Sequence, residues 1–220
     1  MIDLVGRKDI NIINVEGCHC IYDISVREYV LNGIPKYEYK YSLPKKLINA
    51  YKSVTKAGKI IIHAAGNEGE ELQPYQFSET QTIFYSPYFF DLLDKLNSEE
   101  KLSIAIVGNL DPDTRSAIAS SNKPGKRTDA QERFLFAPAG KVKLSYTGEV
   151  FNGGTSLAAP YICAAVANLL SKSKTLTPKK ALNILLESSE KQQDVATYGR
   201  GIIRASRALE VLDEPLKNRR

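Results

Sequence analysis

Residues 44–69 read PKKLINAYKSVTKAGKIIIHAAGNEG and contain the pattern of a helix, a buried strand and a loop in direct succession. Apolar side chains recur at helical spacing from Leu47 onward, Pro44 suits a first helical turn, and Gly58 is placed to end the helix. The run at 59–63 is centred on three consecutive isoleucines, which is typical of a strand buried on both faces. This order predicts a helix that leads directly into a central strand of a parallel sheet.

A second strand is predicted upstream, in the apolar run at 9–15. A strand, a helix and a strand in succession form a βαβ unit, whose two strands run parallel. Residues 28–41 lie between the first strand and the helix and contain Asn32-Gly33, a pair typical of a tight hairpin turn. Tyrosines then alternate with charged residues up to position 41. The sequence therefore predicts an α/β fold with an inserted β-hairpin.

The second half of the chain continues the alternation of helices and strands. We expect a short helix at 88–96, buried strands at 102–107 and 134–137, a polar loop at 111–133, and helices at 156–170, from Thr177 onward and at 203–212. The helix from Ser156 is apolar nearly all round, so it is predicted to be buried.

Length and composition are typical of one globular domain. The chain has 220 residues, of which 43% are hydrophobic and 25% charged, and this balance excludes a disordered or fibrous protein. The net charge of +5 is scattered rather than gathered in a basic stripe, so we expect no nucleic-acid partner. The most apolar stretch, 157–167, contains Pro160 and is shorter than the about 20 residues that a membrane-spanning helix needs.

Cysteine usage and the N-terminus exclude several further classes. Three cysteines are too few for a disulfide framework. Cys18-His19-Cys20 is spaced too tightly for a common zinc site and lacks a second pair, so we interpret the segment as structural and expect no metal and no cofactor. The first residues lack the positively charged segment and following apolar run of a signal peptide.

The loop after the predicted central strand reads Ala64-Ala65-Gly66-Asn67-Glu68-Gly69. In parallel sheets ligands bind beyond the carboxyl ends of the strands, which is where this loop starts. The Asn67 amide can donate a hydrogen bond to a developing oxyanion, and the neighbouring glycines let a substrate backbone approach.

A second candidate segment, Asn152-Gly153-Gly154-Thr155-Ser156-Leu157-Ala158-Ala159-Pro160, opens the apolar helix. A serine at the first turn has its hydroxyl at the positive end of the helix dipole, and its backbone N–H is left without an intrahelical acceptor. Ser156 is therefore a candidate nucleophile. The alternative is that Thr155 or Ser156 only caps the helix.

Together these two segments resemble the subtilisin-like serine proteases, the subtilases. The loop around Asn67 is similar to that family's oxyanion-hole motif, and Gly-Thr-Ser-Leu-Ala-Ala-Pro is similar to its nucleophile motif. Three further segments resemble the family in the same order along the chain: residues 103–108, residues 136–140 with Ala139 inserted, and Tyr198-Gly199-Arg200-Gly201-Ile202-Ile203.

The resemblance implies a three-layer αβα fold with a mainly parallel sheet and the activity of a serine endopeptidase. It implies that Ser156 is the nucleophile and that Asn67 is the side-chain donor of the oxyanion hole. It also implies that Ala65, Gly66 and Gly154 bind a peptide or protein substrate.

The sequence departs from the family because it lacks the motifs that supply the catalytic base and the carboxylate that orients it. The family's Asp-Ser/Thr-Gly and His-Gly-Thr motifs are absent, and neither of the two histidines, His19 and His63, is in the register of the family's base. His63 as a substitute base is one hypothesis, and a buried, hydrogen-bonded His63 is the other. Residues 13–18 also depart from the family's Ile-Asn-x-Ser-Leu-Gly, whose backbone pairs with substrate.

We therefore expect residues 1–212 to be an N-terminally truncated subtilase catalytic domain, followed by a frayed basic tail at 213–220. The isolated chain is expected to be inactive. The alternatives are a non-catalytic peptide-binding or interaction module and one half of a split protease, with a separately encoded N-terminal fragment carrying the Asp and His. The family is most often secreted.

Overall fold

A computed structural model describes residues 6–16, 23–31, 34–71, 88–139, 141–143 and 146–217. Its centre is a five-stranded sheet in the order β1-β4-β5-β6-β9, and every adjacent pair is parallel. The strands are β1 (Ile12–Val15), β4 (Ile60–Ala64), β5 (Ile104–Leu110), β6 (Phe134–Pro138) and β9 (Gly201–Ile202). The predicted parallel α/β sheet is confirmed.

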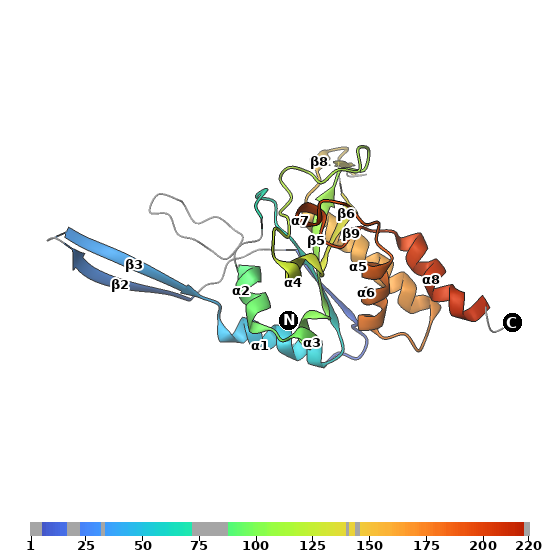
Figure 1. Ribbon diagram of the computed structural model, residues 1–220, viewed down its shortest axis with the longest axis horizontal. Coiled ribbons are helices and arrows are strands. Elements are labelled where there is room, and N and C mark those ends of the chain that lie inside the picture. Colours follow the sequence, from blue (N-terminus) through green and yellow to red (C-terminus); the bar gives the residue numbers. More distant parts are fainter. Residues whose placement is uncertain are drawn as a thin grey trace.

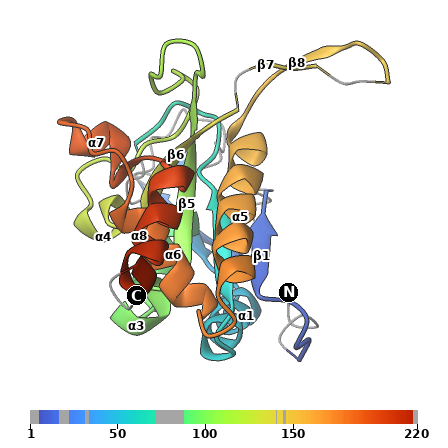
Figure 2. The ribbon, with the colours of Figure 1, turned by 90° about the vertical axis from the view of Figure 1, so that its right-hand side faces the viewer.

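Helices cover both faces of this sheet, which makes three layers (Figure 1). On one face lie α1 (Lys45–Lys56), α2 (Tyr88–Lys95) and α3 (Ser98–Lys101), and on the other lie α5 (Thr155–Lys172), α6 (Pro178–Glu187) and α8 (Ala205–Lys217). Figure 2 shows the second set in front of the sheet, with α5 beside β1.

Alternation along β4 divides the core between the two faces. Ile61 packs in a cluster with Val54 of α1, whereas Ile62 packs in a second cluster with Ile162 of α5. Successive side chains of a strand point to opposite faces, and both faces are covered here, so three isoleucines follow one another without polar residues between them. All five residues of β4 are buried.

Two antiparallel hairpins lie outside the central sheet. β2 (Asp23–Leu31) pairs with β3 (Ile34–Ser42), so the hairpin starts five residues earlier than predicted, and its Asn32-Gly33 turn lies outside the described residues. This ribbon extends to one side of the body in Figure 1. The second hairpin, β7 (Lys141–Lys143) with β8 (Val150–Asn152), was not predicted and immediately precedes α5.

One predicted helix begins at the cap that the sequence indicates, and another does not. The Thr177 side chain accepts a hydrogen bond from the Lys180 N–H at the start of α6, and Pro178 occupies the first helical position. In α5 the N-cap is Gly154 and no side chain caps the helix, so the alternative that Thr155 or Ser156 is the cap is wrong: these are the first two helical residues. α8 continues to Lys217, beyond Pro215, so it extends past the predicted end of the last helix at 212.

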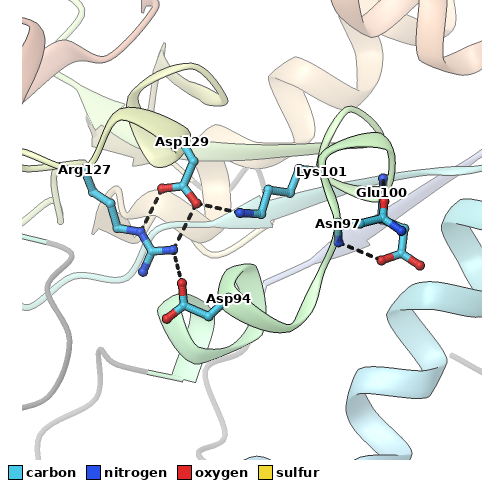
Figure 3. Close-up of polar contacts among 6 residues, drawn as sticks. All are labelled: Asp94, Asn97, Glu100, Lys101, Arg127 and Asp129. Atoms are coloured by element: carbon cyan, nitrogen blue, oxygen red, sulfur yellow. Dashed lines mark hydrogen bonds and ion pairs between the residues drawn. The ribbon is translucent and has the colours of Figure 1, made fainter.

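The short helices α3, α4 (Thr128–Gln131) and α7 (Val195–Tyr198) were not predicted. A network of ion pairs joins α2, α3 and α4 (Figure 3). The Asp129 carboxylate contacts Arg127 Nε at 2.7 Å and Lys101 Nζ at 2.8 Å, and Arg127 also contacts Asp94. The hydrogen bond from Arg127, followed by that from Lys101, holds the pKa of Asp129 well below its usual range.

In the part of the chain that the structure describes, no helix is both long enough and apolar enough to cross a membrane.

Candidate active site

Two loops meet beyond the carboxyl end of the sheet. The Asn67 loop (residues 65–70) follows β4, and the Ser156 turn (residues 153–156) leads from β8 into α5. Two reciprocal hydrogen bonds join them: the Gly66 N–H donates to Thr155 Oγ1 at 3.1 Å, and the Thr155 N–H donates to Asn67 Oδ1 at 2.9 Å. The structure thus brings the two sequence-predicted segments together.

Asn67 is oriented by this contact. Its side-chain oxygen accepts from the helix N-terminus, so its Nδ2 group is the part of the amide that can donate to a ligand. Asn67 is exposed, and no described residue accepts a hydrogen bond from Nδ2. A free amide donor beside a helix N-terminus is suited to binding a negatively charged oxygen.

Ser156 is the second residue of α5 and is half-buried. Its Oγ donates to the Glu16 carbonyl oxygen, 3.2 Å away at the end of β1. Among the described residues, none accepts a hydrogen bond from the Ser156 N–H, as expected in a first helical turn. A hydroxyl group and a backbone donor therefore belong to one residue, directly after the Thr155 that contacts Asn67.

Two glycines are required for this close approach. A Cβ on Gly154 would lie 3.1 Å from Asn67 Oδ1 and 3.2 Å from its Nδ2. A Cβ on Gly66 would lie 2.4 Å from Asn122 Nδ2, and the positive φ of +103° at Gly66 itself disfavours other residues. Ala65 is buried, and its N–H donates to the Val107 carbonyl oxygen, which ties the loop to β5.

The Asn122 side chain fixes the Asn67 loop by hydrogen bonds. The sequence did not predict this role. The side chain of Asn122 is fully buried. Its Oδ1 accepts from the Glu68 and Glu70 N–H groups, and its Nδ2 donates to the Ala65 carbonyl oxygen and to the Glu68 carboxylate. The only sequence signal for Asn122 is its place in the turn-forming run Asn-Lys-Pro-Gly.

Asn109, near the end of β5, fixes the Ser156 turn by a hydrogen bond. Its Nδ2 donates to the Gly153 carbonyl oxygen at 3.0 Å, and its backbone N–H donates to Ser121 Oγ at 2.9 Å. Asn109 is 1% exposed, and its Oδ1 has no partner among the described residues. Both loops of the site are thus held by buried asparagines.

His63 does not face the site. It lies on the same face of β4 as Ile61, whereas α5, which carries Ser156, packs on the face of Ile62. Its ring is buried, with Nδ1 2.6 Å from the Ala64 carbonyl oxygen. Burial lowers the pKa of His63 to about 4. The structure therefore supports the hypothesis of a buried, hydrogen-bonded histidine.

The described residues include no cluster of three or more His, Cys, Asp or Glu side chains placed to hold a metal ion. Cys18, His19 and Cys20 lie outside the described residues. Cys163, in α5, has a free thiol whose pKa burial raises to about 11, so the thiolate form is disfavoured at neutral pH.

Comparisons with known proteins support the resemblance to the subtilases. Residues 32–201 match the model of the subtilase family. Subtilisin DY of Bacillus licheniformis is 27% identical over 169 residues, which cover 76% of this chain and 51% of that protein. The chain thus spans about half the length of that relative.

Solved structures share the fold. The prenylagaramide maturation protease PagA superposes with a TM-score of 0.63 at 21% identity, covering 96% of this chain and 65% of that one. The PatG macrocyclase in complex with peptide gives a TM-score of 0.60 at 18% identity, covering 96% and 55% respectively. At such identities the likeness concerns the fold, but the family model matches most of the chain, and we conclude that this chain belongs to the subtilase family.

Proposed function

We propose that this chain is the nucleophile and oxyanion-hole part of a subtilisin-like serine endopeptidase. The observation that carries the proposal is the pair of hydrogen bonds between the Asn67 loop and Thr155, the residue before Ser156. In this proposal the Asn67 Nδ2 and the Ser156 N–H bind the oxyanion. Ala65, Gly66 and Gly154 bind the peptide backbone beside it.

The proposed reaction is acyl transfer. Ser156 Oγ attacks the carbonyl carbon of the scissile bond while a base takes its proton, and the carbonyl oxygen becomes the oxyanion. Collapse of this intermediate releases the amine, which takes up the proton, and leaves an acyl group on Ser156. Water then hydrolyses that ester.

The base is proposed to come from a second polypeptide segment that carries the family's Asp and His motifs. His63 is unsuited because it is buried on the other face of β4. Among the described residues no strand pairs with the outer edge of β1, and α5 exposes Leu157 and Tyr161 close to Ser156. An unpaired strand edge beside exposed apolar side chains supports a partner that extends the sheet and covers this end of α5.

A peptide as the ligand is supported by the structural neighbours. They include maturation proteases and a macrocyclase in complex with peptide. The glycines of the site agree with this, because a peptide backbone needs space next to the oxyanion donors.

Reconstitution in trans tests the proposal. A subtilase fragment with the Asp and His motifs is added to the chain, and peptide hydrolysis is measured. We expect activity that Ser156→Ala lowers by about 10⁶ in kcat, a value borrowed from a subtilisin, the same family. Asn67→Ala should lower kcat by about 10²–10³, also a subtilisin value, because the Ser156 N–H donor remains.

His63→Ala is the matched control and should leave kcat unchanged. Full activity in Asn67→Ala would overturn the oxyanion-hole assignment. A loss in His63→Ala as large as that in Ser156→Ala would show that the base lies within this chain.

The second candidate is a peptide-binding module without turnover, which the burial of His63 favours. The complex reconstituted with the Asp and His fragment distinguishes a protease from a binding module. A complex that assembles and binds peptide but releases no product would identify the binding module.

A further inference from the structure

Glu16 directly follows β1 and lies beside the candidate active site. β1 and β4 are adjacent parallel strands, so their carboxyl ends lie side by side. The Glu16 carbonyl oxygen accepts a hydrogen bond from Ser156 Oγ at 3.2 Å, and the loop after β4 carries Asn67, which contacts the same turn. A peptide that lies against Ser156 and Asn67 therefore passes close to Glu16.

The Glu16 side chain lies on the face of the sheet that α5 covers. Along β1, Ile13 packs in the cluster of the α1 face, whereas Ile12 packs in the cluster of the α5 face. Asn14 and Glu16 follow Ile12 at every second position, so they lie on the α5 face as well. The contact between them agrees with this, because Asn14 Nδ2 donates to Glu16 Oε1 at 2.5 Å. Figure 2 shows α5, which begins at the Ser156 turn, beside β1.

The negative charge of Glu16 is not compensated. Its side chain is exposed, and among the described residues no Lys, Arg or His side chain forms an ion pair with it. Its charge acts on α5: burial, and then the charge of Glu16, raise the pKa of Cys163, about two turns after Ser156. An uncompensated charge at the edge of a binding site attracts ligands of the opposite sign.

The Asn67 loop adds a second carboxylate, that of Glu68. Its Oε2 would lie 2.5 Å from a Cβ on Gly66, so it is next to a glycine that we propose to bind the peptide. Glu68 also forms no ion pair within the part of the chain that the structure describes. Lys123, a cation of the neighbouring loop, acts on Asp194, whose pKa is lowered first by its hydrogen bond with Thr197.

We propose that the candidate active site selects peptides with a lysine or arginine beside the scissile bond, and that Glu16 determines this preference. This inference rests on the proposed function, because it takes the peptide to lie against Asn67 and Ser156. The cationic group is attracted by the Glu16 carboxylate, and the charge of Glu68 adds to the attraction. An acidic side chain at the same position is repelled, so acidic peptides are selected against.

Binding of short peptides to the purified chain tests the proposal without requiring hydrolysis. Three fluorescein-labelled peptides share one alanine-glycine sequence and differ only in a central lysine, glutamine or glutamate. Their dissociation constants are measured by fluorescence anisotropy. We expect the lysine peptide to bind about fivefold more tightly than the glutamine peptide, and the glutamate peptide about fivefold more weakly, as for one exposed charge pair. Both differences should shrink as the salt concentration rises.

Substitutions of Glu16 assign the preference to this residue. Glu16→Gln should remove most of the difference between the lysine and glutamine peptides, and Glu16→Lys should make the glutamate peptide bind more tightly than the lysine peptide. Glu132→Gln is the matched control. Glu132 is an exposed glutamate before β6, at the opposite end of the strands, and its loss should leave the order of the peptides unchanged.

The outcomes separate this inference from the proposed function. An unchanged order in both Glu16 variants, or an equal change in Glu132→Gln, would overturn the role of Glu16. Equal binding of the three peptides to the unmodified chain would overturn the inference and leave the proposed function standing. Binding of none of them would overturn both, because the site would then not hold a peptide.

Discussion

The two ends of the sheet hold their buried polar groups in different ways. At the carboxyl end, Asn122 and Asn109 are neutral amides that bond mainly to backbone N–H and carbonyl groups. At the amino end the buried and half-buried groups are charged: Arg133 bonds to carbonyl oxygens, and Arg127 and Asp129 form ion pairs.

Neutral and charged groups suit the two ends of the sheet to different tasks. A neutral amide that satisfies several backbone groups fixes a loop precisely, and it does so without a counter-ion. Charged groups keep a long-range field, which attracts ligands and responds to salt. The carboxyl end is therefore suited to holding donors at set positions, whereas the ion pairs at the amino end should weaken as the salt concentration rises.

Asn122→Ala should have the largest effect on stability. It leaves the N–H groups of Glu68 and Glu70 and the Ala65 carbonyl oxygen without their side-chain partner. We expect a loss of about 4 kcal/mol in the free energy of unfolding, measured by urea denaturation. The loss should change little between low and high salt, because the amide is neutral and most of its partners are backbone groups.

Asn168→Ala is the control for this variant, since Asn168 is an exposed asparagine on α5. It should leave stability unchanged or raise it slightly, because alanine favours helix. A loss in Asn122→Ala no larger than that in the control would mean that the Asn67 loop is held by other contacts.

Acid should destabilise the protein through His63. The pKa of His63 in the folded chain is about 4, below the about 6.5 of an unfolded histidine, so the unfolded state binds more protons between these values. The free energy of unfolding is therefore greatest above pH 6.5 and falls by about 3 kcal/mol as pH falls to 4.

His63→Gln should remove this part of the pH dependence when urea denaturation is repeated at several pH values. The slope of the free energy of unfolding against pH is compared between the two proteins, since the variant also changes stability at neutral pH. Identical slopes in the two proteins would show that His63 is accessible to protons in the folded state.

Asp129→Asn should have the smallest effect. It removes the carboxylate that Arg127 and Lys101 share (Figure 3). We expect a loss of about 1 kcal/mol at low salt and a smaller loss in high salt. Asp9→Asn, at the exposed Arg7–Asp9 pair, is the control and should cause no measurable change. A loss in Asp129→Asn that is independent of salt would contradict the contrast between the two ends.

The main elements could be predicted because their signals are long and local. β4 begins with three consecutive isoleucines, and α6 has both its Thr177 cap and Pro178. Helices of four residues are too short to show hydrophobic periodicity in the sequence. α3, for example, depends on a capping box between Asn97 and Glu100.

In the candidate site, the sequence predicted the segments that carry Asn67 and Ser156. It did not predict the buried asparagines that hold those segments in place. Asn67 and Ser156 belong to recognisable motifs, whereas Asn109 ends a strand and Asn122 lies in a polar loop. Each of these two asparagines acts on a backbone group far away in sequence, such as Gly153 for Asn109. Such partners depend on tertiary packing, and no local pattern encodes them.

The central claim is that this chain holds a nucleophile and its oxyanion donors but no base. Labelling of the purified chain with a fluorophosphonate probe tests it most directly, with Ser156→Ala as the blank and His63→Ala and His19→Ala as companions. We predict that the chain is labelled very slowly or not at all. Rapid, stoichiometric labelling at Ser156 would contradict the claim, and the histidine variant that abolished it would identify the base.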